Sequence, residues 1–305
     1  MDKNLLMQII ERMENEGFKI HGFTFDLGNK TLMSEIGFFQ KEHYFENPAD
    51  PSRKVYFFPD SCHNLKNARN HLLDDGFQVP SNDGTLVDLT KHDFEEILEK
   101  DSGEFKINFQ LTPNHLNCKN NMRQRVRLAA QLLSNKCAKA MTKLHPEATA
   151  KQKAIETFDN WFDSMNSRRP YDQKQNRCGF GIHRDKQMKA LDDMETFLET
   201  FKVKGKTAWD PWTYGIYISI QSMRALFDEL VENGPFEHIL TARLNQDCLE
   251  NFFSRFRGIS ALMNFIRALK LNYSLVIFSG RWKRRASWTS HGHEENSNSA
   301  DLSTC

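Results

Sequence analysis

The chain has 305 residues and a net charge of +1, with 39% hydrophobic and 27% charged residues. This composition is typical of a globular protein of about two domains, and it excludes binding of nucleic acid through an overall positive field. No apolar run approaches the ~20 residues of a membrane span, and the charged N-terminal segment lacks a signal-peptide core. Six scattered cysteines without a CxxC pair favour a reduced intracellular compartment.

The first predicted elements alternate between helix and strand. Apolar spacing predicts a helix at residues 5–14, a strand at 18–25, a short helix at 31–36 and a buried strand at 55–58. Ser61 can cap the helix that follows. This order predicts an α/β fold, in which Asp26 and Asp60 follow the two strands and lie at the carboxyl edge of a sheet.

The middle of the chain lacks strand signals from about residue 90 to 235, and its apolar spacing predicts a mostly helical block. The expected helices are at residues 94–99, 122–141, 148–165, 186–201 and 218–231.

An amphipathic helix is then predicted from Leu249, Phe252, Phe253 and Phe256, which fall at i, i+3, i+4 and i+7. Asp247 and Glu250 project from neighbouring positions on this helix. Glu250 follows Leu249 at the edge of the apolar stripe, where we expect it to be half-buried. Burying a carboxylate there is costly unless it meets a cation or a metal ion.

Asp26, Asp60 and Glu250 are therefore candidates for a site that holds two divalent ions around a phosphodiester. The alternative is that Asp26 and Asp60 are turn-forming caps and that Glu250 is a solvated helix residue. His63, one helical turn past Asp60, either orients such a site, contacts DNA, or is a satisfied histidine in a capped helix.

Phe162, Asp163 and Asn166 end a predicted helix and suggest a purine pocket, because an aspartate can accept two N–H groups from guanine. The alternative is a helix end with polar caps. No GxxxxGK[ST] loop is present, so this is not a P-loop site. Five cations form a basic face that suits phosphate or DNA, or is simply solvated: Arg123, Arg125, Arg127, Lys136 and Lys139. The basic run at residues 281–285 suits nuclear import or nucleic acid, and residues 286–305 are predicted to be disordered.

Several of these segments together resemble the P-element-type transposases, including relatives with a THAP DNA-binding domain. The resembling stretches occur in family order at residues 25–29, 58–67, 125–134, 162–167, 211–215 and 240–257. The most specific is the pattern Leu-Asn-Gln-Asp-x-x-Glu-x-Phe-Phe-Ser-x-x-Arg at residues 244–257.

The resemblance implies an RNase H-like fold interrupted by a helical GTP-binding insertion, and a Mg²⁺-dependent DNA cleavage and strand transfer with GTP as cofactor. It implies that Asp26 and Glu250 are catalytic metal ligands, supported by Asp60, His63 and Asp247. The residues that it places at the guanine nucleotide are Phe162, Asp163, Asn166, Arg125, Val126 and Ser134. The expected boundaries are 1–88 and 216–280 for the RNase H-like parts, 89–215 for the insertion and 281–305 for the tail.

The chain also departs from the family pattern. The family's first catalytic aspartate and its THAP domain have no counterpart here, the stretch between Gly28 and Asn29 is shortened, and the family's Gly-rich stretch is missing after Gly258. With one of three ligands missing, two ions cannot be held, so we expect a nuclear transposase fragment, incomplete at its N-terminus, that does not cleave DNA alone. The expected partners are transposon-end DNA, GTP and a second copy or a full-length transposase. The alternative functions are a noncatalytic regulator that binds DNA or the transposase, and a decayed product that hardly folds.

Overall fold

The computed structural model describes residues 2–101 and 106–256, which belong to the first of two compact units, Met1–Gly258. The predictions for the basic run at 281–285, the disordered tail and the end of the last RNase H-like part lie outside the described residues, as do the side chains of Phe252, Phe253 and Phe256. In the part of the chain that is described, no helix is long and apolar enough to cross a membrane.

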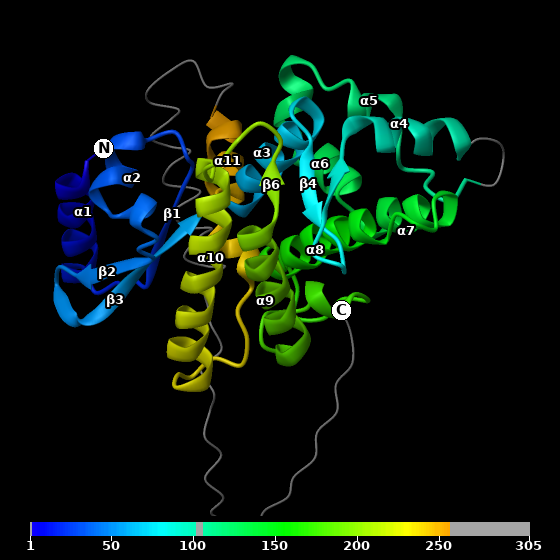
Figure 1. Ribbon diagram of the computed structural model, residues 1–305. Coiled ribbons are helices and arrows are strands. Elements are labelled where there is room, and N and C mark those ends of the chain that lie inside the picture. The colour runs from blue at the N-terminus through cyan, green and yellow to red at the C-terminus, as the bar shows by residue number, and fades with distance from the viewer. Residues whose placement is uncertain (1, 102–105, 257–305) are drawn as a thin grey trace, which may run out of the picture. The chain divides into compact units, whose positions relative to one another are not determined.

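The N-terminal part contains a three-stranded sheet with helices beside it (Figure 1). Its elements are α1 (Lys3–Asn15), β1 (Gly22–Phe25), α2 (Lys30–Glu35), η1 (Phe38–Gln40), β2 (Tyr44–Asn47), β3 (Asp50–Pro59) and α3 (Ser61–Asp74). The sheet has the order β1-β3-β2, with β1 parallel and β2 antiparallel to β3. Phe25 pairs with Pro59, so Asp26 and Asp60 leave the sheet side by side at one edge, as predicted.

This sheet differs from the prediction at two places. The strand expected at 18–25 is limited to Gly22–Phe25, and the residues between the expected helix at 31–36 and the expected strand at 55–58 contain β2 and the start of β3. Pro51 lies at the beginning of β3, where a missing N–H is tolerated, and the pairing is irregular at Glu46 and Asn47.

A second small sheet was not predicted. Its order is β5-β4-β6, and all of its pairs are antiparallel: β4 (Phe77–Pro80), β5 (Leu86–Leu89) and β6 (Lys202–Val203). The expectation of no strand between 90 and 235 is therefore wrong at β6. Strands of two to four residues are too short to show a period in the sequence.

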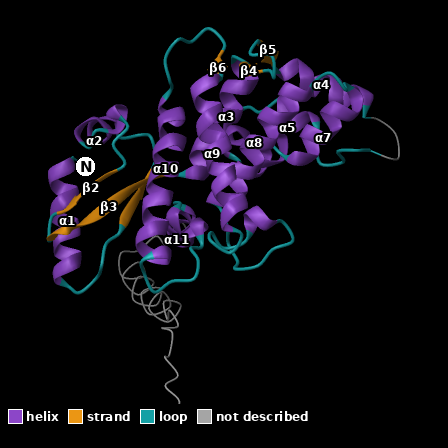
Figure 2. Cartoon of the chain, turned by 60° about the horizontal axis from the view of Figure 1, so that its bottom comes forward, coloured by secondary structure: helices purple, strands orange, loops and turns teal. Residues whose placement is uncertain are grey.

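The remaining described chain is helical, as expected (Figure 2). Its elements are α4 (Lys91–Lys100), α5 (Pro113–Leu116), η2 (Asn120–Gln124), α6 (Val126–Leu132), α7 (Asn135–Leu144), α8 (Thr149–Met165), η3 (Gln175–Arg177), α9 (Arg184–Thr200), α10 (Pro211–Phe227), η4 (Asp228–Glu232), η5 (Thr241–Leu244) and α11 (Asp247–Phe256). The single helix expected at 122–141 is instead η2, α6 and α7. The break lies at Ser134, whose hydroxyl caps α7 by accepting a hydrogen bond from the Cys137 N–H.

Helix α10 joins the two parts, because it packs on both hydrophobic clusters. Ile218 is buried with Phe57 of β3, whereas Trp212 is buried in the larger cluster with Phe77 and Phe158. In Figure 1 this helix accordingly stands between the β1-β3-β2 sheet and α9. The described chain is thus a mostly helical protein with two three-stranded sheets.

Candidate functional site

Helix α8 carries a buried carboxylate near its C-terminus. The Asp163 side chain is 5% exposed, and it accepts hydrogen bonds from Arg177 Nε to Oδ1 and from Lys174 Nζ to Oδ2, both at 2.8 Å. Lys174 also reaches Asp159, one turn earlier on α8, at 2.8 Å. Asp163 is therefore tied to two cations that come from the segment around η3.

Burial and mutual repulsion set the charge state of this group. Burial and the neighbouring Asp163 raise the pKa of Asp159 above its ordinary value. Burial acts to lower the pKa of Lys174, but the carboxylates of Asp159 and Asp163 outweigh it, and the net change is upward. Lys174 thus stays protonated at neutral pH.

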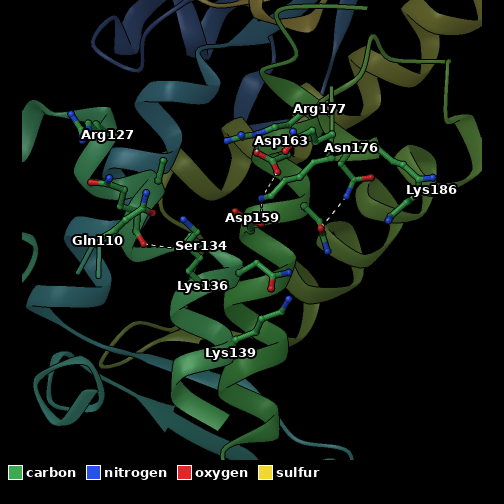
Figure 3. A pocket seen from close by; sticks show the side chains of 17 residues that line it. Gln110, Arg127, Ser134, Lys136, Lys139, Asp159, Asp163, Asn176, Arg177 and Lys186 are labelled. Atoms are coloured by element: carbon green, nitrogen blue, oxygen red, sulfur yellow. Dashed lines mark hydrogen bonds and ion pairs between the residues drawn. The ribbon is translucent and has the colours of Figure 1, made fainter. Parts of the chain in front are cut away.

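A cavity of about 840 Å³ opens beside these residues (Figure 3). Six cations line it, from α6, α7, α9 and the segment around η3: Arg127, Lys136, Lys139, Lys174, Arg177 and Lys186. Asp159 and Asp163 are the carboxylates that line it. The cavity therefore has a strong positive excess in a chain whose net charge is +1, which suits a polyanion.

Two amides in the cavity wall have an unsatisfied acceptor. The side-chain oxygens of Asn135 and Asn176 are buried and have no hydrogen-bond partner among the described residues. Asn176 uses its amide nitrogen to bond Asn160 at 2.9 Å, so its oxygen remains for another donor. Buried polar atoms without partners are uncommon, and here they indicate a ligand or water with N–H or O–H groups.

A second, smaller cavity of about 250 Å³ shares Asp163 and Arg177 with the first. Phe162 and Asn166 line it. The Arg177–Asp163 ion pair therefore stands where the two cavities meet.

The structure brings together most of the residues predicted for the nucleotide. Ser134 and Asp163 line the larger cavity, and Phe162, Asp163 and Asn166 line the smaller one. Arg125 and Val126 line neither; they begin α6, where Arg125 is exposed and Val126 is half-buried.

Sequence reasoning missed Asp159, Lys174 and Arg177. The two cations lie in a polar loop without any periodic pattern, so nothing in the sequence marked them as partners of α8. The basic face predicted on one helix is divided between η2, α6 and α7, and its member Arg123 pairs with Asp74.

The predicted metal ligands Asp26 and Asp60 both have local partners. Asp26 Oδ1 accepts the Gly28 N–H at 3.0 Å, and Asp60 caps α3 by accepting the Cys62 N–H at 2.9 Å. Burial raises the pKa of Asp60 to about 6, and the charges of Asp247 and Glu250 add to this effect. Both carboxylates thus bond nearby backbone N–H groups, as expected if they are turn-forming caps. The charges of Asp247 and Glu250 on α11 nevertheless affect the pKa of Asp60.

His63 lies in the same neighbourhood. Burial lowers its pKa, and the charges of Asp26 and Glu250 act in the opposite direction. Glu250 is exposed on α11, so the expectation that it is half-buried is wrong: this position of α11 faces solvent and not the sheet. Asp247 pairs with Arg168 at 2.6 Å.

A Mg²⁺ ion in a protein is held by several oxygen ligands at once. Within residues 2–101 and 106–256, no group of three or more His, Cys, Asp or Glu side chains is arranged to hold one. The carboxylates are close enough to interact electrostatically, but the described residues do not fit a Mg²⁺ site. The assignment of Asp26 and Glu250 as metal ligands stays a prediction.

The segment before α11 packs on the C-terminal end of α8. Thr241 Oγ1 donates to the Ser164 carbonyl at 2.8 Å, and the Ala242 N–H donates to the Ser167 carbonyl at 3.0 Å. The carboxylate helix and the candidate nucleotide site are therefore neighbours in the fold.

Comparison with known proteins agrees with this arrangement. The family described as "TNP-like, GTP-binding insertion domain" matches residues 62–178. The curated "Transposable element P transposase" of Drosophila melanogaster is 30% identical over 289 residues, which is 90% of this chain and 37% of that protein. The solved structure "Drosophila P element transposase strand transfer complex" matches with a TM-score of 0.77 and 29% identity, over 86% of this chain and 60% of that one.

The chain thus spans little more than a third of the curated relative. The sequence match, the similarity of the folds and the insertion domain agree with one another and with the resemblance found in the sequence. The chain is a homologue of the P element transposase and carries a TNP-like GTP-binding insertion domain.

Proposed function

We propose that this chain binds GTP at the end of α8. The observation that carries the proposal is a buried carboxylate, Asp163, at the junction of a small cavity and a large cavity lined by six cations. The match of residues 62–178 to a GTP-binding insertion domain supports the same ligand.

The two cavities suit the two ends of a nucleotide. The carboxylate of Asp163 can accept the N1–H and the exocyclic amine of guanine, which adenine does not offer in the same pattern. Phe162 and Asn166 lie beside it. The cations and Ser134 of the large cavity suit the phosphates, and the free amide oxygens of Asn135 and Asn176 suit hydroxyl groups.

Titration calorimetry of the full chain with GTP and Mg²⁺, with ATP as competitor, tests this function. We expect selective GTP binding that falls at least tenfold in Asp163→Asn, since a carboxylate that recognises two N–H groups is lost. Asp185→Asn, an exposed aspartate in the first turn of α9, is the matched control. Equal binding of ATP, or an unaffected Asp163→Asn variant, would contradict the proposal.

We further propose that the sheet β1-β3-β2 and α11 form part of an RNase H-like fold, and that the chain does not cleave DNA on its own. The support is that Asp26 and Asp60 leave the sheet at one edge and that the charge of Glu250 acts on Asp60 and His63, yet the described residues provide no group of three metal ligands. The test is incubation with terminal-repeat DNA and Mg²⁺ or Mn²⁺. Cleavage that is lost in Glu250→Gln would overturn it.

A noncatalytic role in the nucleus, as a regulator that binds transposon-end DNA or a full-length transposase, is the second candidate. It is favoured by the similarity to a chain whose structure is titled a strand transfer complex. Co-purification with an intact homologue, alone or on DNA, tests this role. The absence of both complexes would leave nucleotide binding alone.

A further inference from the structure

We propose that Lys174 and Arg177 compete with guanine for the carboxylate of Asp163, so that binding of the base exchanges two ion pairs for two hydrogen bonds from neutral N–H donors. This inference rests on the proposed function, because it concerns how the same site admits its ligand. It adds two residues that determine affinity and a coupling between the base and the phosphates.

The first step is the geometry of Asp163. Arg177 Nε takes one carboxylate oxygen and Lys174 Nζ takes the other, each at 2.8 Å. Asp163 is only 5% exposed, so a ligand can reach it only from the cavities, and both cations line the larger of these. Arg177 also lines the smaller cavity beside Phe162 and Asn166, so a base edge that enters there and bonds both oxygens takes the hydrogen-bond positions that the two cations hold.

The second step is that the cations can leave Asp163, although Lys174 also pairs with Asp159 at 2.8 Å. The side chains of Lys174 and Arg177 are 45% and 51% exposed, and they reach the carboxylate from a short segment on the surface. An ion pair whose cation is half exposed contributes little, because water solvates the released group well. Asp163 itself is held in place, since it lies among the buried residues at the C-terminal end of α8.

The third step is where the cations go. Lys174 and Arg177 line the cavity that also contains Lys136, Lys139 and Lys186, the part that suits phosphates. A phosphate group there attracts the same two side chains and draws them away from Asp163. Phosphate binding thus exposes the carboxylate to the base, and base binding releases the cations to the phosphates.

Such an exchange must be reciprocal. If a phosphate chain raises the affinity for the base, the base raises the affinity for the phosphate chain by the same factor. The site would then bind GTP more tightly than its separate halves suggest, and would bind guanosine poorly.

The experiment uses the full chain with three probes: guanosine, tripolyphosphate and GTP, each by titration calorimetry. The variants are Lys174→Gln, Arg177→Gln and the double variant. Arg184→Gln is the matched control, because Arg184 pairs with Glu232 at 2.9 Å and its side chain is 53% exposed. Circular dichroism confirms that each variant is folded.

We expect each single variant to bind guanosine about two- to fivefold more tightly than the wild type, the range that follows from the loss of one partly exposed ion pair. Saturating tripolyphosphate should raise the guanosine affinity of the wild type by a similar factor, and have no such effect on the double variant. The control should behave as the wild type.

Two negative results are distinguishable. If the wild type binds GTP selectively but the variants bind guanosine equally or more weakly, the competition is wrong and the cations only position Asp163. If neither the wild type nor any variant binds guanosine or GTP, the proposed nucleotide site is wrong, and the competition with it.

Discussion

The side-chain amide of Asn245 donates a hydrogen bond of 3.1 Å to the side-chain oxygen of Asn166. Asn166 caps the C-terminus of α8, three residues after Asp163. Asn245 lies two residues before Asp247, the first residue of α11. Asn245 is 5% exposed and Asn166 is half-buried, so this bond is largely shielded from solvent. It joins the candidate nucleotide site to the helix that carries Glu250 across 79 residues of sequence.

The first prediction concerns this bond. Asn245→Ala should lower the free energy of unfolding by about 1–2 kcal/mol, because it leaves a polar group of Asn166 without its partner in a poorly solvated place. Urea unfolding followed by circular dichroism measures the change. In the double variant with Asn166→Ala the two losses should not add, and strict additivity would show that the bond contributes nothing.

The second prediction concerns the close approach of α10 to α3. A Cβ on Gly215 would lie 2.7 Å from the side-chain oxygen of Asn64, which is fully buried. Gly215→Ala should therefore destabilise the protein by about 1–3 kcal/mol, although the same change in an open helix position stabilises by up to about 1 kcal/mol. Thermal or urea unfolding gives the sign.

Asn64 offers a direct control for that prediction. Neither polar atom of its side-chain amide has a hydrogen-bond partner among the described residues, so Asn64→Ala removes bulk at little cost. In that background Gly215→Ala should cost clearly less. If the cost is the same with Asn64 and with alanine, the contact at 2.7 Å is not what requires glycine here.

The sequence predicted the elements that are long or strongly periodic. The helix at 5–14, the buried strand at 55–58 and the placement of Asp26 and Asp60 at one sheet edge are confirmed, because each depends on local spacing and on parallel strands. It failed at β2, β4, β5 and β6, which are only two to four residues long. Among these four strands, β2 and β5 pair in hairpins with β3 and β4, and β6 pairs with the distant β4.

The residues of the candidate site likewise fall into those that the sequence could predict and those that it could not. Asp163 could be found from its motif, and the structure buries it at the junction of two cavities. Lys174 and Arg177 could not be found, since their role depends on how an irregular segment folds back on α8. Glu250 was expected to be half-buried from its position on an amphipathic stripe, but it faces solvent. The apolar period of a helix shows which face is buried, but it does not show whether a neighbouring element also covers the edge of that face.

The third prediction concerns the pH dependence of stability through Asp60. Burial raises its folded pKa to about 6 from an ordinary value of 3.8. Between these values the folded state binds more protons than the unfolded state, so this group's contribution to stability falls as the pH rises and is lost above the folded pKa. A shift of about two units corresponds to at most about 3 kcal/mol.

Asp60→Asn should therefore raise the free energy of unfolding at pH 8 by about 1–3 kcal/mol and change it little at pH 4, because asparagine caps a helix as well as aspartate. Urea unfolding of both proteins across this range measures the difference. Asp185→Asn, an exposed aspartate in the first turn of α9, is the control. A difference that grows toward acid pH would have the wrong sign and would show that Asp60 is stabilised as a carboxylate.

The last prediction separates the two ends of the nucleotide. Lys136 and Lys139 line the large cavity one turn apart on α7, and neither has a carboxylate partner among the described residues at salt-bridge distance. Replacing both with glutamine should weaken GTP binding about tenfold, and should leave guanosine binding unchanged, because only the phosphates meet these charges. The loss should shrink as salt is added, since screening weakens contacts that are open to solvent. Calorimetry at low and moderate salt measures both effects, with Lys189→Gln, an exposed lysine on α9 outside the cavity, as the control. Equal losses for guanosine and GTP would place the base and not the phosphates beside α7, and would reverse the orientation of the nucleotide in the two cavities.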